Sequence, residues 1–384
     1  MLRRVVILAD ESAHWKIAGL RQLDRLALET NEFALARNET IQLYILWSPD
    51  FPESGKFLPR HPRLNRVEFA TTPPASADLL LSTHLFLHRH SSSRLAAAFH
   101  RYDHLSQNFA ELVAPLRAAW PNTDATERCE YLEDSAQIAA CEKRFLRASG
   151  KSQDGLVSRF INRPISRAIS RVLLKTPVTP TAWTLAIFLL PVAGAAFLTR
   201  GDYFSVVVGL LFFQLYSILD GCDGEIARAK YLESPRGRQL DTWCDVIGNL
   251  LLVLGLGDGL SRVTTPVSFY LIESIFVAIL IVTNELLLLF LSRQSQTPKI
   301  VAGALYPRHE RTFEGSGMLV FGERFAGWLV QLTKRDVALV AFLFLALAGR
   351  SGWILHLLGV VAAISSILAL KSIARARTGS GVIG

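Results

Sequence analysis

The chain has 384 residues, a length that predicts two domains. Half of the residues are hydrophobic, yet they are unevenly placed: residues 1–150 indicate a mixed soluble chain, whereas residues 181–370 are dominated by apolar runs. The net charge of +8 comes from basic residues that flank these runs and form no single block. This distribution favours a membrane surface and phosphate-bearing ligands, and it speaks against nucleic acid as a partner.

The N-terminal residues are not expected to act as a signal peptide. A basic pair precedes the apolar run Val5–Ala9, but this run is too short for the hydrophobic part of a signal peptide and is better interpreted as a buried first strand. The four cysteines show no C-x-x-C spacing, and Cys222 and Cys244 lie on the side expected to face the cytoplasm. Reduced thiols are therefore expected.

Residues 1–150 are predicted to form a soluble α/β domain, because strand-like and helix-like runs alternate along them. The expected strands are Val5–Ala9, Gln42–Trp47, Arg66–Phe69 and Asp78–Leu81, and the expected helices are Leu20–Glu29, Ser93–Ala98 and Ala110–Trp120. The histidines at 84, 88 and 90 could include a metal pair, but no nearby cysteine or carboxylate completes a ligand set. They are interpreted as surface or core histidines.

Residues 151–175 are predicted to form an amphipathic juxtamembrane helix. Within Leu156–Leu174, apolar side chains such as Phe160 and Ile165 alternate with arginines at 159, 163, 167 and 171. Such a helix lies in the plane of the membrane interface. Pro164 is expected to kink it or to start its second segment.

Residues 176–384 are predicted to form a membrane domain with six transmembrane helices, each near the 20 residues that cross a bilayer. The expected spans are residues 181–199, 203–228, 238–260, 266–291, 333–349 and 352–372. Lysine and arginine gather in the connection after the second span, in the connection after the fourth, and in the tail. Both termini are therefore expected on the cytoplasmic side of the cell or inner membrane, together with the polar residues described next.

Four carboxylates stand out within the apolar region: Asp220, Asp223, Asp241 and Asp245. Ionised groups at membrane depth are costly and usually functional, so a positive partner is expected. On helices, the i,i+3 and i,i+4 spacings place each pair on one face, and two such faces could converge. Hard oxygen ligands of this kind suit Mg²⁺ or Mn²⁺.

Small residues and one arginine share these faces: Gly224, Ala227, Arg228 and Gly237. The small residues leave room for a ligand, and the arginine provides a fork for phosphate. The full pattern, D-x2-D-G-x2-A-R-x8-G-x3-D-x3-D, resembles the signature of the CDP-alcohol phosphotransferase family. Carboxylates merely solvated at the membrane surface would explain one or two of the aspartates, but not the glycines, the arginine and the spacing together.

This resemblance implies transfer of a substituted phosphate from a CDP-alcohol to an acceptor hydroxyl, with release of CMP. Matched to the family motif, Asp220, Asp223 and Asp241 would be the main ligands of two Mg²⁺ or Mn²⁺ ions, and Asp245 would be both a ligand and the general base. Gly224, Ala227, Arg228 and Gly237 would line the CDP site. A homodimer is implied as well.

Two further stretches resemble a subgroup of the same family. Residues 154–166 and the Thr-Pro-Val-Thr-Pro at 176–180 resemble the start of the membrane domain in di-inositol-phosphate-phosphate synthases, with Thr181 in place of the usual asparagine. Residues 1–150 resemble, by position and layout, a fused nucleotidyltransferase-like domain. Such domains have a glycine-rich phosphate loop after the first strand, whereas here no glycine occurs before Gly19. The domain is therefore interpreted as degenerate, with a role in assembly.

Acceptor-binding candidates are polar residues near the same edge of the membrane domain: Lys334, Arg335, Arg308, Arg311 and Glu285. The two residues at 334 and 335 could equally be topological flanks of a span. The donor could be CDP-diacylglycerol or CDP-inositol, and a polyol or polyol-phosphate acceptor is expected. The alternative is a catalytically inactive membrane scaffold or a transporter, although a transporter should carry midplane polar sites in two repeats.

Overall fold

The computed structural model describes residues 3–88, 102–106, 108–119, 129–148, 155–264, 268–294 and 334–379. The chain divides into two compact units. Unit 1 contains Met1–Gly150, Ser170–Val178 and Glu225–Leu232, and unit 2 contains Lys151–Ile169, Thr179–Gly224 and Glu233–Gly384.

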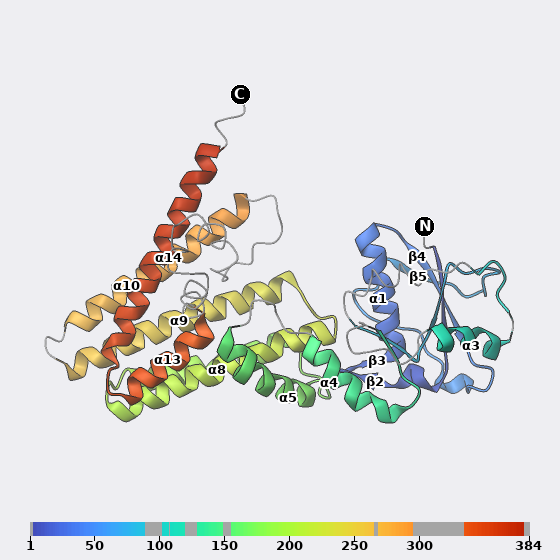
Figure 1. Ribbon diagram of the computed structural model, residues 1–384, viewed down its shortest axis with the longest axis horizontal. Helices are drawn as coiled ribbons and strands as arrows, with labels where there is room; N and C mark the ends of the chain where they lie inside the picture. Colours follow the sequence, from blue (N-terminus) through green and yellow to red (C-terminus); the bar gives the residue numbers. More distant parts are fainter. Residues whose placement is uncertain are drawn as a thin grey trace. The chain divides into compact units, whose positions relative to one another are not determined.

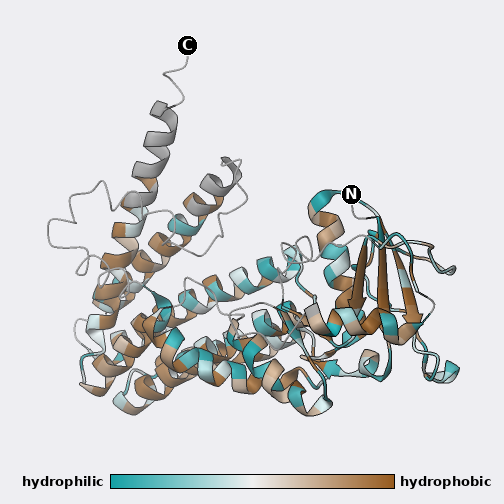
Figure 2. Ribbon diagram, turned by 45° about the vertical axis from the view of Figure 1, so that its right-hand side comes forward, coloured by the Kyte–Doolittle hydropathy of each residue, from teal (hydrophilic) through white to brown (hydrophobic). Residues whose placement is uncertain are grey.

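Unit 1 is built on a parallel four-stranded sheet (Figure 1). The strand order is β5-β4-β1-β6, formed by β5 (Val67–Phe69), β4 (Ile41–Trp47), β1 (Arg4–Ala9) and β6 (Leu79–Ser82). Each strand lies within one or two residues of the stretch that the sequence predicts, which confirms the α/β prediction for this region. Parallel strands buried on both faces are expected to be mainly apolar, and the strands are mostly hydrophobic in Figure 2. β4 and β5 also contain exposed polar residues, Gln42 and Glu68.

Helices cover both faces of this sheet. Alternate residues of β1 point to opposite sides and therefore pack against different helices. Val5 and Ile7 share a core with Leu23 and Leu26 of α1 (Gln22–Arg37). The intervening residues of β1 share a second core with α3 (Phe109–Ala119). The predicted helix at residues 93–98 lies outside the described residues.

A third hydrophobic core in unit 1 joins segments that are far apart in the sequence. It collects residues from the hairpin of β2 (Lys16–Ile17) and β3 (Leu20–Arg21), from β7 (Leu85–Leu87), which pairs with β8 (Cys129–Tyr131), and from α4 (Ile138–Ala148). Leu174, Ile226 and Ala229 complete it. Unit 1 therefore extends beyond the predicted boundary at residue 150.

Unit 2 is helical. A π-helical turn, η4 (Ser158–Asn162), leads into α5 (Arg163–Leu173), and the following helices are α6 (Pro180–Ile187), α7 (Leu189–Leu198), α8 (Tyr203–Ala229), α9 (Pro235–Val263), α10 (Ser268–Gln294), α13 (Arg335–Leu347) and α14 (Gly352–Gly379). α9 packs beside α7 and α10, and α10 packs beside α14. The last residues of α5 and α8 belong to unit 1.

Four stretches in the described residues are long and apolar enough to cross a membrane: Pro180–Leu198, Tyr203–Ala229, Pro235–Val263 and Phe269–Leu287. They coincide with the first four predicted spans. α13 has 13 residues, and the apolar part of α14, Gly352–Ile367, is also shorter than a full span. The total of six spans therefore stays a prediction.

The juxtamembrane helix buries its small and polar residues and exposes its apolar ones. Ser166 and Ser170 are buried, whereas Phe160 and Val172 are 69% and 65% exposed. Pro164 is the second residue of α5, so it starts the second segment, as one of the two predicted outcomes required. The exposed apolar face supports the expectation of a helix that lies in the membrane interface.

Candidate active site

The helices that carry the aspartates form a hairpin with a short connection, residues 230–234. Ser234 caps α9: its Oγ accepts a hydrogen bond from Gly237 N at 3.0 Å, and Pro235 occupies the first helical position. A Cβ atom on Gly237 would lie 3.0 Å from that same Oγ. The motif glycine therefore allows the cap that fixes where α9 begins.

Three of the four aspartates converge. Asp220 and Asp223 lie on one face of α8, Asp241 faces them from α9, and one carboxylate oxygen from each lies within 4.8 Å of the others. Asp223 is buried and the other two are half-buried. Clustered carboxylates repel one another unless a cation lies between them, and carboxylate oxygens gathered in this way could hold a divalent metal ion.

Asp223 is held in place by α6, a contact that the sequence did not reveal. Thr184 Oγ1 donates to Asp223 Oδ2 at 2.6 Å, and Gly224 N donates to Asp223 Oδ1. One turn away, Trp183 Nε1 donates to the Leu219 carbonyl oxygen at 3.0 Å. Hydrogen bonds of this kind orient metal ligands. In the sequence, the only sign of this contact is that Thr184 lies one turn after Pro180 and the Thr179 cap.

Asp245 lies outside the cluster of three and has other partners. Its Oδ1 accepts hydrogen bonds from Tyr216 Oη at 3.2 Å and from Arg335 Nη1. The guanidinium of Arg335 also lies 5.0 Å from the centre of the Tyr216 ring. The structure thus brings one acceptor candidate, from the start of α13, to the predicted general base.

The start of α13 also contacts the juxtamembrane segment. Asp336 Oδ2 accepts a hydrogen bond from Ser158 N at 2.5 Å, and a Cβ atom on Gly155 would collide with the Asp336 carboxylate. A second arginine, Arg163, lies beside the motif helix: a Cβ atom on Gly221 would come 3.0 Å from its Nη1. The sequence predicts Arg163 on the polar face of an interfacial helix, but its side chain is buried.

The remaining site candidates that the structure describes lie on α10, at the start of α13 and at the end of α8. Glu285 is half-buried on α10 and interacts electrostatically with Asp245, and Lys334 precedes α13. Ala227 and Arg228 occupy the last turn of α8, one turn beyond Asp223, in the part of the helix that belongs to unit 1. The predicted candidates Arg308 and Arg311 lie outside the described residues.

A second polar cluster lies in unit 1, where β1 and β6 end. Asp10 Oδ1 accepts hydrogen bonds from Ser12 N at 2.9 Å and Ser12 Oγ at 2.6 Å, and its Oδ2 lies 3.0 Å from His84 Nε2. In a phosphate nest, backbone N–H groups at this position point to the ligand. Here one of them, the amide of Ser12, donates to the chain's own Asp10 carboxylate.

His84 is expected to be an imidazolium, because both of its ring nitrogens face acceptors. Nδ1 lies 2.6 Å from the Leu132 carbonyl oxygen, and Nε2 faces Asp10. Burial opposes the charge on His84, but the hydrogen bond and charge of Asp10 raise its pKa above the ordinary value. Burial likewise raises the pKa of Asp10, but the hydrogen bonds from His84 and Ser12 outweigh it and bring the value to about 2.

The pair should therefore stabilise unit 1 in a defined pH window. The contribution of His84 is complete below its ordinary pKa of 6.5 and is lost as the pH rises through the raised value; that of Asp10 is complete above 3.8 and is lost as the pH falls towards 2. His84→Gln should cost about 1 kcal/mol at pH 5.5 and less at pH 9. Hydrogen exchange of β1 and β6 measures this cost. An equal cost at both pH values would contradict the charged pair.

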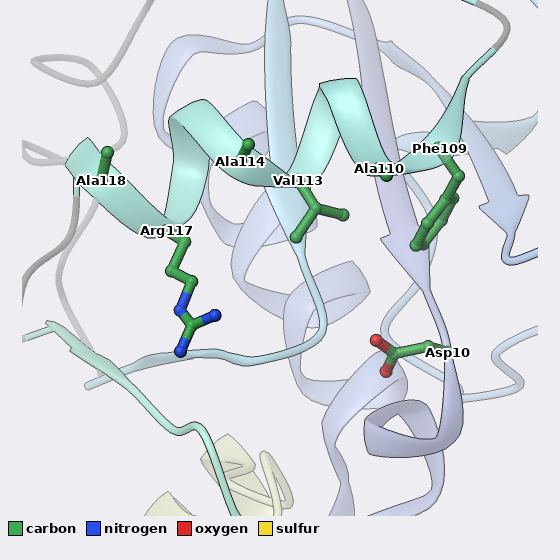
Figure 3. A pocket seen from close by; sticks show the side chains of 7 residues that line it. All are labelled: Asp10, Phe109, Ala110, Val113, Ala114, Arg117 and Ala118. Atoms are coloured by element: carbon green, nitrogen blue, oxygen red, sulfur yellow. The ribbon is translucent and has the colours of Figure 1, made fainter.

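A cavity of about 550 Å³ lies beside this cluster, along α3 (Figure 3). Phe109, Val113 and Arg117 point into it from the helix, and Asp10 borders it on the side of the sheet. Arg117 also binds Glu133, with Nη2 and Oε1 2.8 Å apart. The lining residues that the structure describes are mainly apolar, and none of them is a glycine. The cavity therefore differs from a glycine-rich cradle for a triphosphate.

Comparison with known proteins identifies the helical region. Residues 178–365 match the model of a family described as CDP-alcohol phosphatidyltransferase, and the matched stretch contains the three converging aspartates and Asp245. Residues 178–365 belong to the CDP-alcohol phosphatidyltransferase family. The CDP-alcohol phosphatidyltransferase domain thus begins just after α5 and extends into α14.

Curated relatives of this domain carry a common name, bifunctional IPC transferase and DIPP synthase. The protein from Rubrobacter xylanophilus is 35% identical over 207 residues, which cover 54% of this chain and 43% of the relative. The protein from Archaeoglobus fulgidus is 36% identical over 127 residues, covering 33% and 25%, and that from Thermococcus kodakarensis is 36% identical over 138 residues, covering 35% and 29%. The chain thus matches less than half the length of each of these relatives.

Proposed function

We propose that this protein is an integral membrane CDP-alcohol phosphotransferase that transfers a substituted phosphate from a CDP-alcohol to an acceptor hydroxyl and releases CMP. The observation that carries the proposal is the convergence of Asp220, Asp223 and Asp241 from two helices within a matched family domain. A non-catalytic membrane protein has no need of such a cluster, because charged groups within an apolar region are costly and are usually functional.

Asp220, Asp223 and Asp241 would hold divalent metal, Mg²⁺ or Mn²⁺, and Asp245 would complete a site for two ions. When bound, the ions supply positive charge to the donor pyrophosphate and to the departing CMP. Thr184 would keep Asp223 oriented, since its hydroxyl already donates to the carboxylate at 2.6 Å. Gly224, Ala227, Arg228 and Gly237 would line the space for CDP.

Asp245 would act as the general base. Tyr216 and Arg335 both donate to Oδ1, and among the residues that the structure describes no hydrogen bond reaches Oδ2. Oδ2 would take the proton from the acceptor hydroxyl while the acceptor oxygen bonds to phosphorus and the bond from phosphorus to CMP breaks. Arg335, with its neighbours at the start of α13, would meet an acceptor phosphate.

The donor is proposed to be CDP-diacylglycerol or CDP-inositol, and the acceptor a polyol or polyol phosphate such as inositol phosphate. The name of the curated relatives, which includes DIPP synthase, supports an inositol-type substrate. The exposed apolar face of α5 and the four apolar helices support contact with membrane lipid. The site is proposed to face the cytoplasm, in a homodimer, as the charge distribution and the family resemblance imply.

One experiment tests this function against a scaffold or transporter. The purified chain is incubated with radiolabelled CDP-diacylglycerol or CDP-inositol and a panel of polyols and polyol phosphates, and CMP release is measured. A phosphotransferase releases CMP only when donor and acceptor are both present. A scaffold or transporter releases none with any pair, and that result would overturn the proposal.

The front unit should not make the donor. With the full chain, CTP and inositol phosphate or another phosphorylated polyol, no pyrophosphate should appear above a no-protein control, because Asp10 occupies the amide of Ser12 that a phosphate would need. The full chain is the suitable sample, since the core of unit 1 includes Leu174, Ile226 and Ala229. Pyrophosphate release would instead make the protein bifunctional.

A further inference from the structure

The end of α8 is closed by a left-handed residue that is not glycine. Leu232 N donates to the Ala227 carbonyl oxygen at 2.9 Å, across Tyr231 with φ of +55°. This pattern is a Schellman cap, in which glycine usually takes the left-handed position. A tyrosine there costs about 1 kcal/mol or more of backbone strain, so another interaction must hold it.

That interaction is a buried polar network within unit 1. Tyr231 is fully buried, and its hydroxyl donates to Glu29 Oε1. Arg25, also fully buried, donates from Nη2 to the Ile17 carbonyl oxygen at 2.7 Å and to the Ala229 carbonyl oxygen at 3.3 Å. Arg25, Glu29 and Tyr231 are called the Arg25 network below. Two of its members come from α1, and the third follows α8.

Aromatic and apolar packing surrounds this network. The guanidinium of Arg25 lies 5.1 Å from the Phe86 ring, 5.2 Å from the Phe145 ring and 5.9 Å from the Tyr231 ring. A cation in this position is attracted to the ring faces, and more strongly when water is excluded. Ile226 and Ala229, on the last turns of α8, are fully buried and belong to a hydrophobic core that also contains Phe86 and Phe145.

We propose that the Arg25 network positions the donor-binding end of α8, so that the front unit sets the affinity of the membrane site for its CDP-alcohol. The inference rests on the proposed function. Ala227 and Arg228, which would contact CDP, lie between the metal-binding aspartates and the cap at Tyr231. Arg25 and Tyr231 are positioning residues, because they would act through the end of the helix and not on the substrate.

This role gives the front unit a function in catalysis without nucleotidyl transfer. A helix end held only by its own cap frays readily, because its last carbonyl groups lack partners within the helix. The Arg25 network supplies a partner for one of these carbonyl groups, because Arg25 donates a hydrogen bond to the carbonyl oxygen of Ala229. Loss of the network should therefore weaken binding of the CDP part of the donor and leave the acceptor side, at Arg335, unchanged.

Tyr231→Phe tests the proposal, because it removes one hydroxyl and keeps the ring and the backbone. The matched control is Asn31→Ala, also on α1 and fully buried, whose amide holds residues 63–66 and has no bond to the end of α8 among the described residues. Both variants should lower the thermal stability of the full chain. Only Tyr231→Phe should raise the KM for the CDP-alcohol, by roughly three- to tenfold, with the acceptor KM unchanged.

An unchanged donor KM in folded Tyr231→Phe, or an equal rise in Asn31→Ala, would overturn the inference. Hydrogen exchange of residues 225–232 provides a second readout that does not depend on activity. If the wild type releases no CMP, the proposed function has failed, and this exchange then decides whether the network positions the helix. Faster exchange in Tyr231→Phe alone supports positioning, whereas equal exchange in the wild type and both variants excludes it.

Discussion

Asp241→Asn is expected to lower the rate of CMP release by more than about a hundredfold. Asp241 is the one member of the converging cluster that α9 supplies, so its replacement removes the carboxylate that faces Asp220 and Asp223 from the other helix. Changes to residues that merely orient metal ligands cost about ten- to a hundredfold, and a direct ligand should cost more. Initial rates at saturating donor and acceptor measure the effect.

Asp258→Asn is the control for this variant, because it makes the same chemical change on the same helix. Asp258 pairs with Arg262 at 2.7 Å near the other end of α9, and an exposed pair of this kind contributes little. Activity should also vanish in excess chelator and return with Mg²⁺ or Mn²⁺. Normal CMP release from Asp241→Asn, or full activity in chelator, would refute the metal assignment.

Arg335→Ala should raise the apparent KM for a phosphorylated acceptor by roughly ten- to a hundredfold while the KM for the CDP-alcohol stays nearly constant. A charge-assisted hydrogen bond to phosphate contributes about 1.5–3 kcal/mol, which corresponds to that range. The structure adds a second expectation: Arg335 also donates to Asp245, so kcat should fall as the general base loses one of its two hydrogen-bond donors. Saturation curves for each substrate separate the two effects.

Arg335→Lys and Arg350→Ala complete the experiment. A guanidinium has five N–H donors and can hold Asp245 and a phosphate together, whereas a lysine acts as a single charge. The lysine variant should therefore fall between wild type and alanine. Arg350 follows the opposite end of α13 and is exposed, so its replacement should change neither KM. An unchanged acceptor KM in Arg335→Ala would mean that Arg335 only flanks the helix.

Local spacing predicted the parts of the molecule that depend on neighbours in the sequence. The i,i+3 spacing of Asp220 and Asp223 placed both on one face of α8, and the structure confirms that Asp241 meets them. The strands of unit 1 were predictable because buried parallel strands are short and apolar. Pro164 was expected either to kink the juxtamembrane helix or to start its second segment, and it lies in the first turn of α5, where a proline is tolerated.

Contacts between distant segments could not be predicted in the same way. Nothing in the sequence pattern connects Thr184 to Asp223 or Arg335 to Asp245, because these pairs form only when separate helices pack. Apolar periodicity also failed to predict that unit 1 includes the end of α8, since Ile226 and Ala229 occur within an apolar stretch that indicates a membrane span. They pack with residues of β2, β7 and α4, far away in the sequence.

The short connection between α8 and α9 has a consequence for the order in which a growing chain acquires its site. Asp220, Asp223 and Asp241 come together by closing one short loop, which costs little entropy. Arg335 reaches Asp245 across 90 residues, so it must wait for the last third of the chain to be made. Ribosome-stalled chains of increasing length should therefore bind Mn²⁺ well before the general base gains its guanidinium partner.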